Sequence, residues 1–115
     1  MTPAVMISRL DRALTGYGQT VTLQRTAIDA NGAITVSEEV TCPAAVRAYG
    51  PQDLEAGGVQ SIRVVLSPTE LGSFGIPSRD DRIVINGNPS NVEQIEPLYY
   101  GPGGQLVRVN LLCRG

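Results

Sequence analysis

The sequence predicts a mainly β fold: a small antiparallel β-barrel or sandwich of about six strands, with one N-terminal helix and a long flexible loop. Polar and apolar residues alternate along residues 107–111, and Cys113 continues the apolar face. Asn86-Gly87 lies between two apolar runs, which is the strongest short signal for a β-hairpin. Hairpins favour antiparallel neighbours, and closure of the sheet would protect its edges.

Residues 79–113 are predicted to form three consecutive strands. A type I′ turn at Asn86-Gly87 requires positive φ at both positions, which these two residue types tolerate. Val92 and Ile95 lie an odd number of residues apart, so we expect a β-bulge between them. Pro89 has no N–H and is expected at an edge. After a turn at residues 101–104, the inward side chains are those of Val107, Val109, Leu111 and Cys113.

An amphipathic helix is predicted over residues 1–16. Thr2 would cap it, Pro3 would take the first helical position, and Gly16 would end it. Its apolar stripe consists of Met6, Ile7, Leu10 and Leu14. This stripe packs either on the chain's own sheet or on a neighbouring subunit.

Two strands are expected next, over residues 19–26 and 34–42, joined by a turn at residues 29–32. Glu38 interrupts the inward face of the second strand, and Pro43 is expected to break its ladder before residues 44–49 resume it. The side chains expected to face inward are those of Val21, Leu23, Ile34, Val36, Val40 and Cys42.

A further strand is predicted over residues 62–66, followed by a capping box at Ser67-Pro68-Thr69-Glu70. Leu71 and Phe74 are expected to plug one end of the barrel. Asp80-Asp81 is expected to cap a turn in water, because no further ligands follow at the spacing of a calcium loop.

Residues 50–60 form the longest polar, glycine-rich segment between predicted strands. A loop of this length in a compact domain is usually functional or mobile, and two carboxylates make it acidic. We expect it to be poorly ordered in an isolated subunit, because Leu54 and Val59 are its only sizeable apolar groups.

The 115 residues are predicted to form a single domain, with a helix at 1–16, a β core at 18–49 and 61–113, and the flexible loop at 50–60. A net charge of −2 supplies no general attraction to nucleic acid or to an anionic membrane. No apolar run is long enough to cross a membrane, and the N-terminus lacks the pattern of a signal peptide. We therefore expect synthesis in a cytoplasm, with Cys42 and Cys113 as buried free thiols.

The sequence predicts a binding or assembly module and no enzyme. It contains no histidine, and its two cysteines lack the spacing of a zinc site, so no catalytic residue, cofactor or metal site is predicted. Tyr99-Tyr100 could stack on bases, as in oligonucleotide-binding barrels, although no basic stripe accompanies them.

The order of the predicted elements resembles that of a known family. The segments that carry the resemblance are the strand TVTLQR, the strand ending CPAAVRAY, the VVLSPTEL strand and helix start, and PSRDDRIVINGNPSNVEQIEP with the final VRVNLLCR. The chain is similar over nearly its whole length to the small head–tail joining proteins of tailed bacteriophages and prophages, the head-completion or stopper group. Leu23-Gln24-Arg25 and residues 81–87 are the most telling pieces.

The resemblance implies a structural virion protein without enzyme activity. Such proteins form a homo-oligomeric ring at the neck of the particle, between the portal or adaptor ring and the tail proteins. In such a ring the loop at residues 50–60 would contact its copies, and the predicted channel or ring-contact residues are Gly50, Gln52, Asp53, Leu54, Glu55, Gly57, Gly58 and Gln60. The ring would close the DNA channel without sequence-specific binding and dock the tail, after synthesis in the cytoplasm of a bacterial host. The alternatives are a tail-completion, tail-terminator or adaptor protein and an oligonucleotide-binding small barrel.

Overall fold

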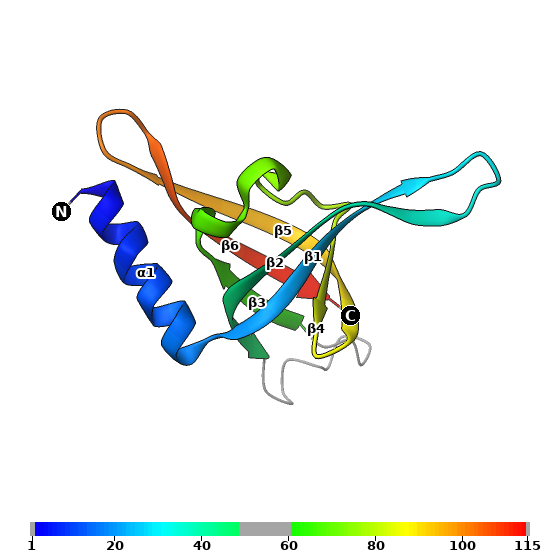
Figure 1. Ribbon diagram of the computed structural model, residues 1–115, viewed down its shortest axis with the longest axis horizontal. Coiled ribbons are helices and arrows are strands. Elements are labelled where there is room, and N and C mark those ends of the chain that lie inside the picture. The colour runs from blue at the N-terminus through cyan, green and yellow to red at the C-terminus, as the bar shows by residue number, and fades with distance from the viewer. Residues whose placement is uncertain (1, 49–60, 115) are drawn as a thin grey trace.

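The computed structural model describes residues 2–48 and 61–114. Within them a helix precedes six strands, with two short 3-10 turns between the third and fourth strands (Figure 1). The elements are α1 (Pro3–Tyr17), β1 (Gln19–Ile28), β2 (Ile34–Ala48), β3 (Ser61–Leu66), η2 (Pro68–Glu70), η3 (Gly72–Phe74), β4 (Arg82–Ile85), β5 (Asn88–Tyr100) and β6 (Gln105–Arg114).

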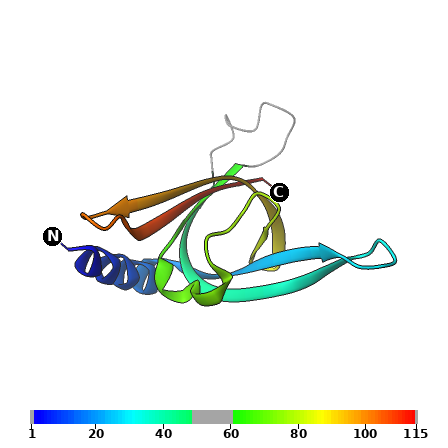
Figure 2. The ribbon, with the colours of Figure 1, turned by 90° about the horizontal axis from the view of Figure 1, so that it is seen from above.

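The six strands form a closed barrel in the order β1-β2-β3-β6-β5-β4, and every neighbouring pair is antiparallel. Figure 2 looks almost straight into this barrel. The predicted mainly β, antiparallel fold is therefore confirmed, and of the two predicted forms the chain adopts the barrel. Closure leaves no open sheet edge within the barrel wall, which removes the usual site of edge-to-edge aggregation.

The predicted hairpin between β4 and β5 is present. Asn86 and Gly87 have φ values of 52° and 80°, as a type I′ turn requires. The predicted bulge is also confirmed, because the β5–β6 register shifts between Val92 and Gln94. Pro89 pairs with Val84 of β4, while β6 joins β5 only from Asn91, so the proline has a neighbour on one side alone.

The predicted inward side chains of β1 and β6 fill the barrel. On β6 these are Val107, Val109, Leu111 and Cys113, all buried. Leu71 and Phe74, from the 3-10 turns, belong to the same buried cluster and cover one end of the barrel, as predicted. Ser67 caps the first of these turns by accepting the Thr69 N–H at 3.3 Å.

The helix α1 begins as predicted and ends later. Thr2 Oγ1 accepts the Val5 N–H at 3.2 Å, and Pro3 follows it in the first turn. Gly16 does not end the helix, because α1 continues to Tyr17 and its cap is Gly18. A Cβ atom at Gly18 would lie 2.5 Å from the carbonyl oxygens of both Leu14 and Ala44, so only glycine fits this close approach of helix to strand.

Pro43 does not break the second strand. β2 runs without interruption through this residue, which pairs with Thr20 of β1. β3 joins β2 only from Ala44, so at Pro43 the strand has β1 as its single neighbour. The missing N–H of Pro43 therefore breaks no hydrogen bond to β3. The predicted break was therefore wrong.

Candidate assembly surfaces

The hairpin between β1 and β2 leaves the barrel. β4 pairs with β1 only over Val21–Gln24, and β3 pairs with β2 only from Ala44 onward. Beyond these points the two strands have only each other, and all residues from 27 to 39 are exposed. Figure 1 shows the resulting two-stranded ribbon projecting to the right of the barrel. We refer to residues 26–36 as the arm.

A β-bulge at the base of the arm decides which side chains share a face. Arg25 pairs with Glu38, whereas Thr26 pairs with Val36, so β2 carries one extra residue there. Because a bulge changes the alternation on the strand that carries it, Ile34 and Val36 do not lie on the inward face of Val40 and Cys42. They share a face with Ile28, which continues the outer surface of the barrel.

The predicted inward positions of Ile34 and Val36 were therefore wrong. Ile28 is 75% exposed and Ile34 is 69% exposed, and they pair directly across the arm. Val36 is also exposed. Three β-branched apolar side chains thus lie together on a ribbon that contacts no third strand, and such a ribbon has little independent stability in water.

The tip of the arm is a well-defined turn. Asp29 Oδ1 accepts the N–H groups of Asn31 and Ala33, both at 2.9 Å, and Gly32 has a φ of 81°. The carboxylate therefore fixes the turn that the sequence predicted at residues 29–32.

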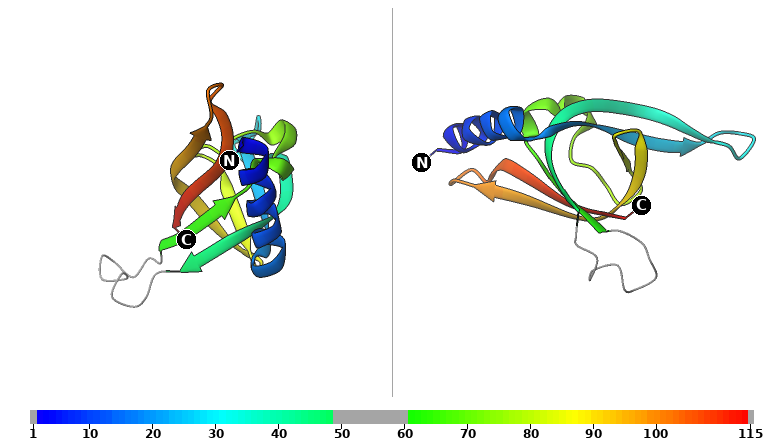
Figure 3. Two further views of the ribbon diagram at one scale, coloured as in Figure 1. Left: turned by 90° about the vertical axis from the view of Figure 1, so that its left-hand side faces the viewer. Right: turned by 90° about the horizontal axis from the view of Figure 1, so that it is seen from below.

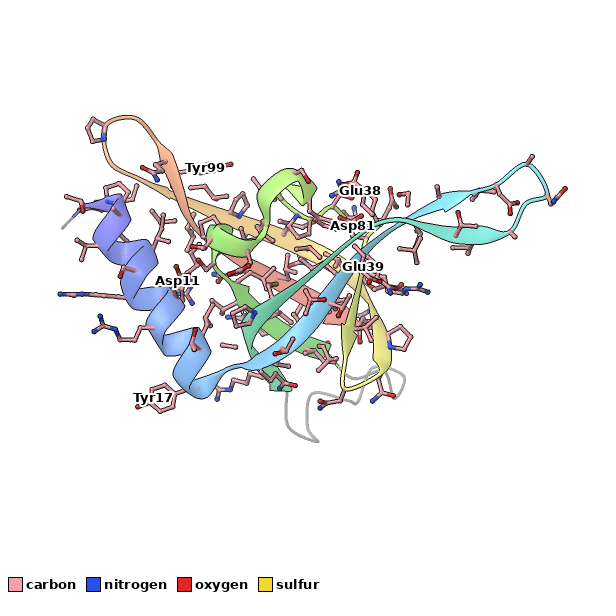
Figure 4. All side chains as sticks on the ribbon, viewed as in Figure 1. Asp11, Tyr17, Glu38, Glu39, Asp81 and Tyr99 are labelled. Atoms are coloured by element: carbon pink, nitrogen blue, oxygen red, sulfur yellow. The ribbon has the colours of Figure 1, made fainter. Side chains whose placement is uncertain are left out.

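A partly buried ion pair anchors the base of the arm. Arg25 Nε and Nη2 donate to the two carboxylate oxygens of Asp81 at 3.2 and 3.1 Å. Arg25 Nη1 donates to the Phe74 carbonyl oxygen at 3.0 Å, and the guanidinium lies 4.2 Å from the centre of the Phe74 ring. The hydrogen bonds to Asp81 raise the pKa of Arg25 against the opposing effect of burial. Asp81 and Glu38 lie close to this point in Figure 4.

Asp81 is only 2% exposed, so the prediction that it lies in water was wrong. Its Oδ2 also accepts the Ser78 N–H at 2.8 Å, so the carboxylate holds both the arm and the turn before β4. A signal was available in the sequence: Arg25 continues the inward alternation of Val21 and Leu23, and an inward guanidinium needs a buried anion.

The opposite end of the molecule is built by the start of α1 and the β5–β6 hairpin (Figures 1 and 2). These two segments touch, because a Cβ atom at Gly101 would lie 3.2 Å from Pro3 Cγ. Thr69 Oγ1 donates to Asp11 Oδ2 at 2.7 Å and holds the middle of the helix to η2. We call this region, residues 3–12 and 97–108, the helix end.

The helix end exposes apolar and aromatic side chains. Only Leu14 of the predicted apolar stripe of α1 is buried, and the others are half-buried. The helix thus packs on its own barrel mainly near its C-terminus. The remaining residues of the stripe are half-buried, so they contact the barrel and also leave surface for a neighbouring subunit. The exposed apolar side chains here are Val5, Leu98, Tyr99 and Tyr100.

The two ends differ in charge. Residues 26–39 contain Asp29, Glu38 and Glu39 and no basic residue. Glu38 lies 3.9 Å from Arg25, and Glu39 Oε2 accepts a hydrogen bond from Gln24 Nε2 at 2.9 Å. At the other end the exposed side chains of Arg9, Arg12 and Arg108 outnumber the single carboxylate, Asp11.

The described residues offer no group of three or more histidine, cysteine, aspartate or glutamate side chains that could hold a metal ion. A hollow of about 220 Å³ lies over β5 and β6 and is lined by Arg63, Glu96, Asn110 and neighbouring side chains. These groups already bond to one another in part, since Asn110 Nδ2 donates to Glu96 Oε1 at 3.2 Å. No helix among the described residues is long and apolar enough to cross a membrane.

Cys42 and Cys113 are free and buried, as predicted. Burial raises the pKa of the Cys42 thiol to about 11 and that of Cys113 to about 12. Both groups are therefore protonated at neutral pH, and the thiolate, which is the reactive form, is scarce.

The eight residues predicted to contact the ring, from Gly50 to Gln60, lie outside the described residues. Of the surfaces described above, the helix end includes two features that the sequence analysis considered for contacts, the helix stripe and Tyr99-Tyr100, whereas the arm was expected to belong to the barrel wall. Figure 3 shows the helix and the β5–β6 hairpin from two further sides, with the arm pointing away from both.

Comparison with solved structures shows a similarity of fold. No protein-family model matches the sequence, and no curated protein matches it. The fold is similar to that of a chain from a solved structure described as "Virion of native gene transfer agent (GTA) particle", with a TM-score of 0.48 and 15% sequence identity. The match covers 84% of this chain and 91% of that chain.

Proposed function

We propose that this chain is a structural protein of a tailed-phage or phage-like virion, and that it forms a homo-oligomeric ring at the neck. The ring would close the DNA channel after packaging and dock the tail. The proposal rests on the resemblance of the sequence to head–tail joining proteins and on one structural observation. A rigid closed barrel carries two projecting ends with exposed apolar side chains.

This observation supports an assembly role for a physical reason. Exposed apolar side chains that gather on projecting segments usually mark contacts with other proteins. The barrel gives such segments a fixed base, and Arg25 and Asp81 fix the arm to it. A structural protein needs this rigidity, whereas it needs no cluster of catalytic groups.

The predicted loop at residues 50–60 keeps its proposed role in the channel. Asp53 and Glu55 would face the lumen and repel the phosphates of packaged DNA. With a net charge of −2, the subunit would add little attraction for DNA. Deletion of residues 55–59 would then leave folding intact while packaged DNA leaks or tails fail to attach.

The direct test removes the gene from a strain that produces the particle. We expect DNA-filled heads without tails, or heads that lose their DNA, and restoration of tailed particles by the gene supplied in trans. Electron microscopy of the neck would then locate the ring. Complete, infectious particles in the absence of the chain would refute the proposal. Co-purification with tail rings alone would assign it instead to tail completion or termination, and with the portal alone to an adaptor.

A second candidate, an oligonucleotide-binding barrel, is favoured by the exposure of Tyr99 and Tyr100. It requires single-stranded DNA affinity that falls steeply with salt and is lost when both tyrosines are replaced by alanine. Absence of measurable binding at low salt would exclude it.

A further inference from the structure

We propose that copies of this chain associate head to tail, with the arm of one subunit seated on the helix end of the next. This contact deepens the proposed neck ring and rests on it for its biological setting. The partner is thus a second copy of the chain, and the two surfaces that meet are different.

Both surfaces carry apolar side chains that the subunit itself leaves uncovered. On the arm these are Ile28, Ile34 and Val36, which share one face. On the helix end they are Val5, Leu98, Tyr99 and Tyr100. Leu98 and Tyr100 share one face of β5, and Tyr99 lies on its other face. Branched aliphatic groups and tyrosine rings are well suited to each other, because large aromatic surfaces bury much area at little cost in conformational entropy.

The charges of the two surfaces are complementary. Residues 26–39 carry Asp29, Glu38 and Glu39 and no basic residue. Glu39 lies on the same face as Val36, whereas Glu38 pairs with Arg25 on the other face. The helix end carries exposed Arg9, Arg12 and Arg108. Attraction between such surfaces orients the encounter and disfavours arm-to-arm contact, where like charges would meet.

The geometry prevents one subunit from satisfying both surfaces. The arm and the helix end project in opposite directions along the long axis, which spans 47 Å (Figures 1 and 2). A contact between two different surfaces of identical chains is heterologous, so it propagates from copy to copy and closes into a ring when the rotation allows. An arm-to-arm dimer would instead stop at two subunits.

Site-specific cross-linking of the purified full chain tests this arrangement. Asn31→Cys places a thiol at the arm tip, and Tyr99→Cys places one on the helix end; the native thiols are buried and react slowly. The two variants, one carrying a mass tag, are mixed at high concentration with a short bis-maleimide. We expect tagged–untagged dimers several-fold above those from Asn31→Cys alone. The matched control pairs Asn31→Cys with Asn88→Cys, at the exposed β4–β5 turn.

A charge exchange provides a second measurement. Glu39→Arg in the arm variant should lower the cross-linking yield, as should Arg9→Glu with Arg12→Glu in the helix-end variant. Mixing the two charge-reversed proteins should restore the yield, because attraction returns with opposite sign. The restored cross-linking yield should fall as the salt concentration rises, because salt screens the attraction between exposed charges.

A yield equal to that of the Asn88→Cys control, or dimers linked only through arm tips, would overturn the proposed contact. The two proposals fail separately. If particles assemble without the chain, the neck role is refuted, while mixed cross-linking still supports the contact. If the chain is needed for tailed particles but no mixed cross-link forms, the contact alone is refuted and the arm faces a different protein.

Discussion

Asp81 shows how one side chain connects three parts of the molecule. It is almost fully buried, and its two oxygens accept hydrogen bonds from Arg25 on β1 and from the Ser78 N–H before β4. Arg25 in turn covers the ring of Phe74, which closes one end of the barrel. The carboxylate can be buried here because hydrogen bonds from Arg25 and from the Ser78 N–H offset the free-energy cost of removing its charge from water.

Asp81→Ala should therefore lower the free energy of unfolding. Loss of one partner of a buried pair costs up to 3–5 kcal/mol, but the Arg25 side chain is 30% exposed, so we expect about 2–3 kcal/mol. Urea denaturation followed by circular dichroism measures it. The adjacent, exposed Asp80 is the matched control, and Asp80→Ala should change stability by no more than about 0.5 kcal/mol. Equal effects of the two substitutions would contradict the anchoring role.

The two cysteines should resist alkylation in the folded protein. Their pKa values are raised to about 11 and about 12, so the thiolate fraction at pH 8 is far below that of an ordinary thiol. Mass spectrometry after treatment with iodoacetamide should show no adduct in the native protein and two after denaturation. Because burial favours the protonated form, native reactivity should rise only as the pH approaches 11. Rapid native labelling at pH 8 would show that the barrel opens more readily than its packing indicates.

At the level of the elements, replacement by alanine should change the stability of the protein in opposite directions at Gly16, inside α1, and at Gly18, its C-terminal cap. Gly18→Ala forces a Cβ atom against two carbonyl oxygens and should destabilise the fold by about 1–3 kcal/mol. Gly16 lies inside the helix, and a Cβ atom there would meet no other atom within 4 Å, so Gly16→Ala should stabilise the protein by about 0.5–1 kcal/mol. Thermal melting of both variants measures the difference. A destabilising Gly16→Ala would mean that the helix is less regular here.

The arm should be dispensable for folding. Residues 27–35 can be replaced by Asn-Gly, because Thr26 and Val36 are paired neighbours across the ribbon. These residues are exposed and contribute nothing to the core, so the melting temperature should change by only a few degrees, while head-to-tail cross-linking is lost. Replacing Ile28, Ile34 and Val36 with threonine keeps the ribbon and tests its apolar face alone. Loss of folding in either variant would show that the arm is part of the barrel's stability.

Local signals predicted the barrel wall well and the arm poorly. The turn at Asn86-Gly87 and the bulge after Val92 depend on nearby residues, so the sequence contains all the information they need. Ile34 and Val36 looked like core residues because alternation places them in line with Cys42. The bulge opposite Arg25 shifts that alternation. A bulge arises from the pairing of two strands, so the alternation within β2 alone does not reveal it.

At the scale of the whole molecule, the net charge of −2 conceals an uneven distribution. Acidic groups gather at residues 29–39, on the arm and beside its base, and basic groups gather on the helix end, although these segments lie far apart in the sequence. The composition shows that the chain has no strongly basic character, but it does not show that acidic and basic side chains lie at opposite ends of the long axis. That polarity requires knowledge of which segments project together, which only the closed topology provides.

The ladder that closes the barrel also bears on how the protein opens. β1 and β4 share only four Cα pairs, from Val21↔Ile85 to Gln24↔Arg82, and they join segments about sixty residues apart. Non-local pairings of this kind form late in folding, since the entropy of closing the intervening chain must first be offset. Arg82 Nε donates to Gln24 Oε1 at 2.9 Å, and Arg25 with Asp81 extends the same ladder by one side-chain pair.

This seam is therefore where the barrel should open most often. In native hydrogen exchange, we expect the paired amides of Val21–Gln24 and Arg82–Ile85 to exchange faster than those in the middle of β6. Asp81→Ala should accelerate the seam amides selectively, and uniform acceleration of all strands would mean that the barrel opens as one unit. In the ring proposed above, a subunit that opens along a defined line would adjust its width as neighbours are added.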